Sequence, residues 1–231
     1  MRALIIQPDP QCGPGLIGTR LEERGYALDI EAIVRQDPFA TPDVSWDPPD
    51  PRDWDLVVAL GARWSAYDDE TVGSWLSGEL KLLRTAHEAE VPVLGVCFGG
   101  QALARALGGT VQRAQHPEIG WVSLDTDEPG LVGRGPWFQW HFDQFTPPPG
   151  SVEIARNAVA SQAFRVERSL GLQFHPELTE SILEGWLRES GMKHAQAGVV
   201  DSEELRAMTA DQMSAARVRA NALVDAFLEL R

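Results

Sequence analysis

Cys97 is the residue whose neighbours point most directly to chemistry. It ends an apolar run and is framed by glycines in the pattern Gly95-x-Cys97-x-Gly99, which is the spacing of a nucleophile elbow. Such a turn projects the side chain away from the sheet at the start of a helix, where oriented backbone N–H groups favour a thiolate. The N–H of Phe98 would then donate to an oxyanion. A buried structural cysteine is the alternative, so a catalytic Cys97 requires a base nearby.

The base has two candidates of identical local sequence, because residues 116–118 and 175–177 are both His-Pro-Glu. His175 ends the apolar run 170–174, a predicted strand whose carboxyl end would lie beside that of the Cys97 strand, where active sites of open α/β sheets collect. Glu177 can reach Nδ1 of His175 and orient the ring, which completes a nucleophile, a base and a carboxylate. His116 follows polar residues, and we predict a surface turn without a catalytic role there.

The other histidines are weaker candidates. His87 lies on a predicted helix beside acidic residues and His194 lies in the C-terminal tail, so both are expected to be solvated. His141 lies in the aromatic segment 138–143, which suits either the core or the lining of a pocket. No pair of histidines has a metal-ligand spacing such as His-x-x-x-His, so no metal is expected.

The elements that must position these residues alternate between apolar strands and helices. This alternation implies right-handed crossovers and a mostly parallel sheet that helices cover on both faces. The segment 36–52, rich in Pro and Asp, is predicted to be a loop. The predicted strands cover 2–7, 27–34, 55–61 and 91–96, and the predicted helices cover 16–24, 72–89 and 99–107.

Beyond residue 110 the pattern changes. Short strand-like pieces over 111–174, separated by Gly and Pro, predict β-hairpins on one side of the parallel sheet, and helices are predicted over 178–190 and 202–230. We expect one domain over 1–190 and a helical extension over 191–231 that packs on it; a helix that docks a partner is the alternative. The expected packing face of the last helix consists of Leu205, Met208, Met213, Val218, Leu223, Phe227 and Leu228.

Composition limits the function classes. The chain has 231 residues and a formal net charge of −14, which argues against nucleic acid as a partner because neutralising phosphates needs a basic face. No stretch approaches the ~18 apolar residues of a membrane span, and the first apolar run is too short for a signal peptide. The two cysteines, Cys12 and Cys97, cannot form a disulfide framework, so we expect a cytoplasmic protein.

Taken together, the segments around Cys97 and His175 resemble the class I glutamine amidotransferase family. The likeness extends over residues 56–186, and the segments 118–121 and 138–141 are similar to free-standing members related to the glutaminase domain of GMP synthase. The resemblance implies a flavodoxin-like α/β fold and a Cys–His–Glu triad that hydrolyses the side-chain amide of glutamine. Cys97 would be the nucleophile, His175 the base and acid, and Glu177 the orienting carboxylate, with no cofactor.

The resemblance also assigns the substrate site. The backbone N–H groups of Ala62 and Phe98 would bind the oxyanion. The family usually has Gly-Gly-Pro where this chain has Gly-Ala-Arg at 61–63. Ala62 keeps the N–H but disfavours positive φ, and we expect the Arg63 guanidinium at the pocket rim, where it would favour an acidic substrate. The residues that would bind glutamine, with segment 140–143 against its α-carboxylate and α-amino groups, are Gly61, Gln101, Trp140, His141 and Asp143.

Family members normally pass ammonia to a synthetase. After Trp186 about 45 residues remain, too few for an ATP-binding domain, and no Walker-type phosphate loop occurs. The leading hypothesis is therefore hydrolysis of glutamine, or of a γ-glutamyl compound, that supplies ammonia to a separate acceptor enzyme. A self-contained hydrolase of γ-glutamyl amides or peptides is the second hypothesis, and a catalytically silent binding or regulatory module is the third. No nucleic acid or membrane partner is expected.

Overall fold

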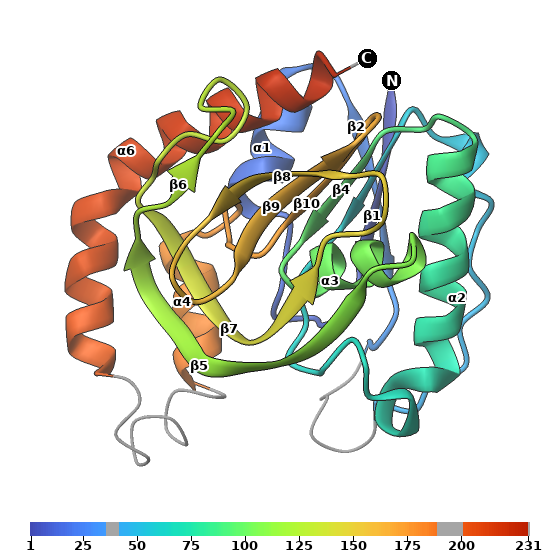
Figure 1. The fold of residues 1–231 in the computed structure, drawn as a ribbon, viewed down its shortest axis with the longest axis horizontal. Coiled ribbons are helices and arrows are strands. Elements are labelled where there is room, and N and C mark those ends of the chain that lie inside the picture. Colours follow the sequence, from blue (N-terminus) through green and yellow to red (C-terminus); the bar gives the residue numbers. More distant parts are fainter. Residues whose placement is uncertain (36–41, 189–200, 231) are drawn as a thin grey trace.

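The apolar segments of the first half of the chain form a parallel sheet at the centre of the molecule (Figure 1). The computed structural model describes residues 1–35, 42–188 and 201–230. Along the sheet the order is β2-β1-β3-β4-β10, and each of these strands runs parallel to its neighbour. The strand that precedes His175 therefore lies beside the strand that precedes Cys97, as expected. These strands are β1 (Arg2–Gln7), β2 (Ala27–Ala32), β3 (Leu56–Ala59), β4 (Val93–Val96) and β10 (Ser169–Leu172).

Antiparallel strands extend the sheet beyond β10. In order these are β9 (Ser161–Val166), β8 (Val152–Arg156) and β6 (Asp125–Thr126). β5 (Thr110–Val122) and β7 (Trp137–Thr146) form a separate antiparallel pair, which lies in front of the main sheet in Figure 1. The prediction that all pieces of 111–174 lie on one side of the parallel sheet holds for β5 and β7. It is wrong for β9, β8 and β6, which continue the sheet itself. The edge of β10 that is not bonded to β4 offers backbone groups, and β9 bonds to them.

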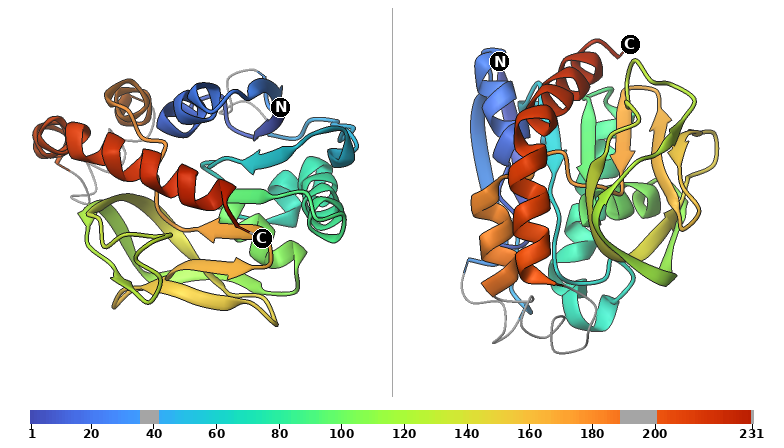
Figure 2. Two further views of the ribbon diagram at one scale, coloured as in Figure 1. Left: turned by 90° about the horizontal axis from the view of Figure 1, so that it is seen from above. Right: turned by 90° about the vertical axis from the view of Figure 1, so that its left-hand side faces the viewer.

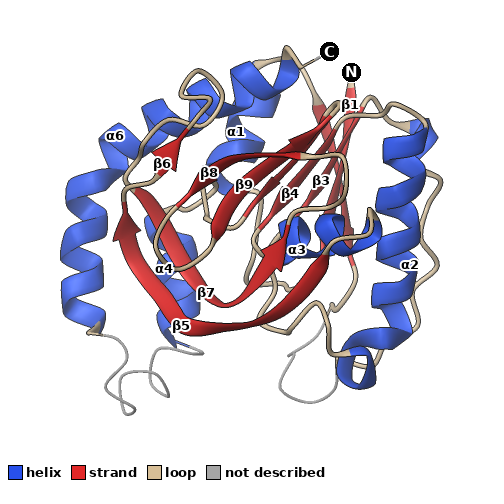
Figure 3. Ribbon diagram, in the orientation of Figure 1, coloured by secondary structure: helices blue, strands red, loops and turns tan. Residues whose placement is uncertain are grey.

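Helices cover both faces of the sheet (Figure 3), so the predicted α/β class with a mostly parallel sheet is confirmed. α1, α4 and α6 lie side by side on one face (Figure 2), and α2 and α3 cover the other. Within the predicted loop, residues 42–50 have no helix or strand and 36–41 lie outside the described residues. The helices are α1 (Gly15–Glu23), α2 (Asp69–Glu88), α3 (Phe98–Ala106), α4 (Glu180–Trp186) and α6 (Ser202–Leu228), with a short 3₁₀ helix η1 at Pro51–Asp53.

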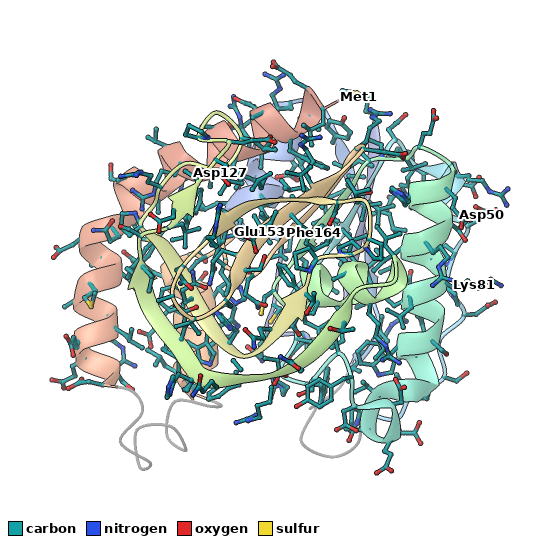
Figure 4. The ribbon with its side chains drawn as sticks, viewed as in Figure 1. Met1, Asp50, Lys81, Asp127, Glu153 and Phe164 are labelled. Atoms are coloured by element: carbon teal, nitrogen blue, oxygen red, sulfur yellow. The ribbon has the colours of Figure 1, made fainter. Side chains whose placement is uncertain are left out.

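Alternation along each buried strand divides the core between the two faces. In β1, Ala3 and Ile5 belong to the cluster under α1 and α6, whereas Leu4 and Ile6 belong to the cluster under α2 and α3. Successive strand side chains point to opposite faces, so a sheet covered on both sides requires fully apolar strands. Each buried Leu or Ile contributes about 1.5–3 kcal/mol. Phe164 of β9 lies in the second cluster, in the interior of the molecule in Figure 4.

α6 buries only part of the predicted face: Leu205, Leu223 and Phe227 are buried as expected. Met208 is 37% exposed and Val218 is 68% exposed, so the predicted face is wrong at these positions. The prediction counted only large apolar residues, whereas small side chains and Thr209, which accepts a hydrogen bond from Trp121 Nε1 at 3.1 Å, fill part of the real face. α6 packs on α1 and α4, and the division of the chain at residue 190 stays a prediction. The buried residues of α6 are Leu205, Thr209, Ala216, Ala220, Leu223, Val224 and Phe227.

Candidate active site

The backbone at Cys97 makes the sharp strand-to-helix turn that the glycine spacing predicts. Cys97 has a φ of 51° and a ψ of −109°, a conformation that residues with a side chain rarely adopt. A Cβ at Gly99 would collide with the carbonyl group of Ala59, and one at Gly100 would collide with that of Leu172. The N–H of Cys97 donates to the Leu172 carbonyl at 2.8 Å, which ties the turn to β10.

His175 and Glu177 follow β10 and are buried beside the cysteine. Nδ1 of His175 lies 2.7 Å from Oε1 of Glu177, and the two residues are 4% and 0% exposed. Backbone hydrogen bonds hold this turn: the N–H of His175 donates to the carbonyl of Phe138, and the carbonyl of Glu177 accepts from the N–H of Leu16, both at 2.9 Å. The other ring nitrogen, Nε2, has no hydrogen-bond partner among the described residues. The ring therefore presents a free nitrogen in the cavity that Cys97 also lines.

The electrostatics of this group favour a charged imidazole. Burial by itself lowers the pKa of His175, but the negative charges of Glu177 and Cys97 outweigh burial and raise that pKa to about 10. The ring therefore keeps its proton at neutral pH while the anionic partners are present.

Within the described residues, two cavities meet at Cys97. The larger has a volume of about 250 Å³ and the smaller a volume of about 50 Å³. Cys97, Ala62, Arg63 and Trp140 line both. The smaller cavity is completed by Asp9, Cys12, His175 and Trp186. The larger cavity is completed by Trp64, Ser65, Phe98, Gln101, Arg113, His141, Phe142 and Asp143.

The residues predicted for the oxyanion site border the cysteine. A Cβ at Gly61 would lie 3.3 Å from Cε1 of His175 and 3.8 Å from Cβ of Cys97, so the 61–62 backbone passes directly over the site. Ala62 lines both cavities. The Phe98 side chain is buried and packs on Trp75, with ring centroids 5.8 Å apart, so its backbone is the part that can serve substrate.

Gln101 and Asp143 lie together in the larger cavity. Nε2 of Gln101 donates to the backbone carbonyl of Asp143 and to Oε1 of Gln173, both at 3.3 Å. The Asp143 carboxylate accepts hydrogen bonds from Ser65 Oγ at 2.6 Å and from the Tyr67 hydroxyl at 3.4 Å. These contacts hold a carboxylate at the cavity wall, where it can bind a cationic group.

His141 differs from the other residues predicted to bind glutamine, because both of its ring nitrogens already contact groups of the protein. Nδ1 lies 3.0 Å from the carbonyl oxygen of Asp143 and Nε2 lies 3.1 Å from Oε2 of Glu118. Glu118 is 8% exposed and also accepts from Gln162 Nε2 at 2.8 Å and Asn157 Nδ2 at 2.7 Å. His141 thus lines the larger cavity, but both of its ring nitrogens contact groups of the protein, which gives it a supporting position there. Sequence reasoning missed the burial of Glu118, because it treated the whole 116–118 tripeptide as a surface turn.

The remaining histidines are placed as follows. His116 is exposed, as expected, but it lies within β5 rather than in a turn, between Arg113 and Glu118, where the register with β7 shifts. The expectation that His87 is solvated is wrong: its side chain is 17% exposed, and Nδ1 lies 3.0 Å from Oγ of Ser169. His194 lies outside the described residues.

Comparison with known proteins agrees with this geometry. Residues 68–189 match the family model described as glutamine amidotransferase class-I. The chain belongs to this family. Among curated relatives, it is 40% identical over 116 residues to a glutamine-hydrolysing GMP synthase of Thermus thermophilus, a match that covers 45% of this chain and 23% of the relative. It is 29% identical over 188 residues to the glutamine-hydrolysing GMP synthase of Bordetella parapertussis, a match that covers 72% of this chain and 32% of the relative.

One solved structure matches this chain over its full length. The crystal structure of a glutamine amidotransferase from Methylobacillus flagellatus superposes with a TM-score of 0.84 at 28% sequence identity, covering 100% of this chain and 95% of the other. In contrast, the chain spans less than a third of the length of the two GMP synthases. The region shared with this chain is thus only a part of each GMP synthase.

Residues 61–63 depart from the sequence pattern of the family. An ion pair between Arg63 and Asp9 holds this segment in place. Nε of Arg63 donates to Oδ2 of Asp9 at 2.7 Å and Nη2 donates to Oδ1 at 3.0 Å, while the backbone N–H of Arg63 donates to Oδ2 at 3.2 Å. Asp9 is 1% exposed. Arg63 lines both cavities, which agrees with the predicted place at the pocket rim. Nε and Nη2 of its guanidinium are hydrogen-bonded to Asp9. Sequence reasoning missed Asp9 and Cys12, since nothing local marks residues that reach a site from the loop after β1.

Across residues 1–35, 42–188 and 201–230, no group of three or more His, Cys, Asp or Glu side chains is arranged to hold a metal ion. Over the same ranges, no helix is both long enough and apolar enough to cross a bilayer.

Proposed function

We propose that this amidotransferase hydrolyses the side-chain amide of glutamine with Cys97 as nucleophile, His175 as acid and base, and Glu177 as the carboxylate that orients the imidazole. The observation that carries the proposal is the 2.7 Å contact between Nδ1 of His175 and Oε1 of Glu177, fully buried beside a cysteine held at a φ of 51°. The complete set of three groups favours catalysis over a silent binding module.

The chemistry follows from the charges on these groups. The Cys97 thiolate attacks the carboxamide carbon, and the N–H groups of Ala62 and Phe98 stabilise the oxyanion. The C–N bond then breaks, and Nε2 of His175 gives its proton to the departing nitrogen, which leaves as ammonia. A water molecule that His175 deprotonates attacks the thioester, the C–S bond breaks, and glutamate is released with the thiolate restored. The net reaction converts glutamine and water to glutamate and ammonia.

Substrate binding is proposed for the larger cavity, whose volume of about 250 Å³ suits an amino acid. The Asp143 carboxylate would pair with the α-ammonium group, and the 140–143 backbone with Gln101 would complete the site. Gly61 would let the substrate approach Cys97 closely. We assign these roles to residues 1–190 as one amidotransferase domain, with 191–231 as a helical extension packed on it.

The fate of the ammonia is the second part of the proposal. The GMP synthases that the chain resembles are about three to four times as long as the shared region, and we propose that a separate acceptor enzyme uses the ammonia made here. Because the mechanism needs a reduced thiol, we place the enzyme in the cytoplasm. Glutamine is the proposed substrate in preference to γ-glutamyl peptides.

Ammonia release from glutamine by the purified protein tests the hydrolysis. The wild-type protein should release ammonia and glutamate in equal amounts, and Cys97→Ala should abolish release. Cys12→Ala, which removes the other buried thiol, should still release ammonia, because Cys12 lines the cavity but should not carry the acyl group. Acylation at Cys12, or full activity in Cys97→Ala, would contradict the proposal.

A further inference from the structure

Gln173 is a buried polar side chain that the proposed mechanism does not use. It lies two residues before His175 and is 0% exposed. Its Nε2 lies 3.9 Å from Sγ of Cys97, within reach of a hydrogen bond to sulfur. Gln173 lines neither of the two cavities that meet at Cys97. It therefore contacts the sulfur from the interior of the protein and not from the side on which a substrate would lie.

We propose that Gln173 stabilises the Cys97 thiolate by donating an N–H to its sulfur. The inference rests on the proposed function, because it takes Cys97 to react as a thiolate nucleophile. A hydrogen bond to a charged acceptor is stronger than one between neutral groups, so this contact favours the thiolate over the thiol. Gln173 thus adds a donor to the two features that already favour negative charge on this sulfur, the start of α3 and the protonated ring of His175.

A chain of amide groups fixes which end of the Gln173 side chain faces the sulfur. The backbone carbonyl oxygen of Asp143 can only accept, so the end of Gln101 that lies 3.3 Å from it is the NH₂ group. The same nitrogen of Gln101 lies 3.3 Å from the Gln173 side chain, which must therefore present its oxygen, Oε1, to Gln101. The NH₂ end of Gln173 is left for Cys97. The opposite orientation would place two NH₂ groups against each other and an oxygen against the thiolate.

Backbone hydrogen bonds hold Gln173 and Cys97 in this arrangement. The N–H of Gln173 donates to the carbonyl of Gln162 in β9 at 2.9 Å, and the N–H of Cys97 donates to the carbonyl of Leu172 at 2.8 Å. The amide and the sulfur are therefore carried by the adjacent ends of β10 and β4. Gln173 lies within reach of the sulfur without any rearrangement of the backbone.

The carbonyl group of Trp140 gives the sulfur a second polar neighbour with the opposite preference. Its oxygen lies 4.0 Å from Sγ of Cys97, where it can accept the S–H of the thiol but would repel a thiolate. The NH₂ group of Gln173 donates strongly to a thiolate and only weakly to the sulfur of a thiol. Loss of this donor would therefore shift the balance toward the protonated, unreactive form of Cys97.

The pH dependence of Cys97 alkylation by iodoacetamide, located by mass spectrometry, tests this inference. The thiolate displaces iodide and forms a C–S bond, so the rate follows the fraction of thiolate. Gln173→Met removes the donor and keeps a side chain of similar length. Alkylation near neutral pH should slow by about tenfold or more, with the half-maximal rate reached at higher pH, and kcat/KM for glutamine should fall by a similar factor.

Gln139→Met is the matched control. Gln139 is also fully buried, but its Nε2 donates to Oε1 of Gln162 at 2.9 Å and does not contact Cys97. The control should keep the wild-type pH dependence of alkylation even if urea denaturation shows that both variants lose stability. Loss of packing alone would not move the pH dependence, so this measurement separates a contact to the thiolate from a structural role.

Gln173→Asn is a second variant that keeps an amide but draws it back from the sulfur by one C–C bond. It should slow alkylation in the same direction as Gln173→Met, and it carries the test if the methionine variant does not fold. Wild-type alkylation in a folded Gln173 variant would overturn this inference and leave the proposed hydrolysis intact. Failure of the wild-type protein to release ammonia from glutamine would instead overturn the proposed function, and with it the nucleophile that this inference assumes.

Discussion

Residues 116–118 and 175–177 have the same sequence, His-Pro-Glu, in two different backbone settings. The first copy lies within β5 at a shift of register, where His116 is exposed and Glu118 is buried. The second copy follows the end of β10, and both His175 and Glu177 are buried and in contact. In an extended strand, residues i and i+2 lie about 6.5–7 Å apart. A histidine and a glutamate at this spacing can reach each other in either setting. Here the copy in the turn after β10 pairs, whereas Glu118 binds His141 and Gln162 instead.

The two glutamates consequently act on different partners. Glu177 contacts the ring beside it and helps raise the pKa of His175. Glu118 accepts hydrogen bonds from His141 of β7 and Gln162 of β9, so it links the separate strand pair to the main sheet. The comparison teaches that one carboxylate raises the pKa of a neighbouring buried imidazole while the other holds strands together. Substitutions in the two copies should therefore affect different quantities.

The largest effect is expected from His175→Ala. This change removes the group that gives and takes the proton, so kcat for glutamine should fall by about 10³-fold or more. Steady-state ammonia release measures the loss, and His116→Ala is the matched control from the other copy. Similar losses in the two variants would contradict the assignment of the base to the second tripeptide.

Glu177→Gln should lower kcat by about 10²- to 10⁴-fold, because the imidazole loses its orientation and its stabilising charge. It should also change the pH dependence. The pKa of His175 is about 10 in the wild type, so a step that needs the imidazolium loses rate only as pH rises toward 10. Without the carboxylate that pKa falls, and the alkaline limb of the kcat profile should move to lower pH. An unmoved limb would contradict this coupling.

The raised pKa of His175 should also make the free energy of unfolding depend on pH. The folded-state pKa of His175 lies above its ordinary value of 6.5, so the contact with Glu177 contributes fully to the free energy of unfolding below pH 6.5. The contribution is lost as pH rises through about 10. Urea denaturation of wild type and Glu177→Gln should therefore give a difference that shrinks between these pH values.

In the first copy, Glu118→Ala should act on stability before it acts on chemistry. It leaves the donor of the buried Gln162 without its acceptor, which costs about 1–3 kcal/mol, and it removes the acceptor of the half-buried Asn157, which can bond water instead. Urea denaturation measures the loss, and KM for glutamine should rise more than kcat falls because His141 supports the wall at Asp143. Glu118→Gln keeps the side-chain size and should lose less. A kcat loss as large as that of Glu177→Gln would remove the distinction between the two copies.

The smallest effect is expected from His116→Ala. The side chain is exposed within β5, so the free energy of unfolding should change by no more than about 0.5 kcal/mol and kcat should stay at the wild-type value. A marked loss of activity would mean that the exposed histidine of the first copy takes part in the reaction.

Much of the site could be predicted from the sequence because its decisive contacts are local. The glycines that permit the turn lie within a few residues of Cys97, and the partner of His175 is two residues away. The parallel sheet followed from apolar strands alternating with helices, which also predicted that the Cys97 and His175 strands end at the same edge. Local spacing and periodicity were enough for these features.

Other parts depended on tertiary structure. The Asp9–Arg63 pair joins loops that follow β1 and β3, and the burial of Glu118 depends on a register shift in β5. The packing face of α6 was predicted only in part, because alanines and a threonine are buried by the elements around them, whereas Met208 and Val218 are exposed.

By itself, the sequence determined the elements, the elbow and the His175–Glu177 spacing. The tertiary structure alone decided that Glu118 binds side chains of β7 and β9, and that Asp9 pairs with Arg63 beside the site. The physical reason is that side chains two residues apart are related by the local backbone, whereas contacts between distant loops depend on strand order, register and packing.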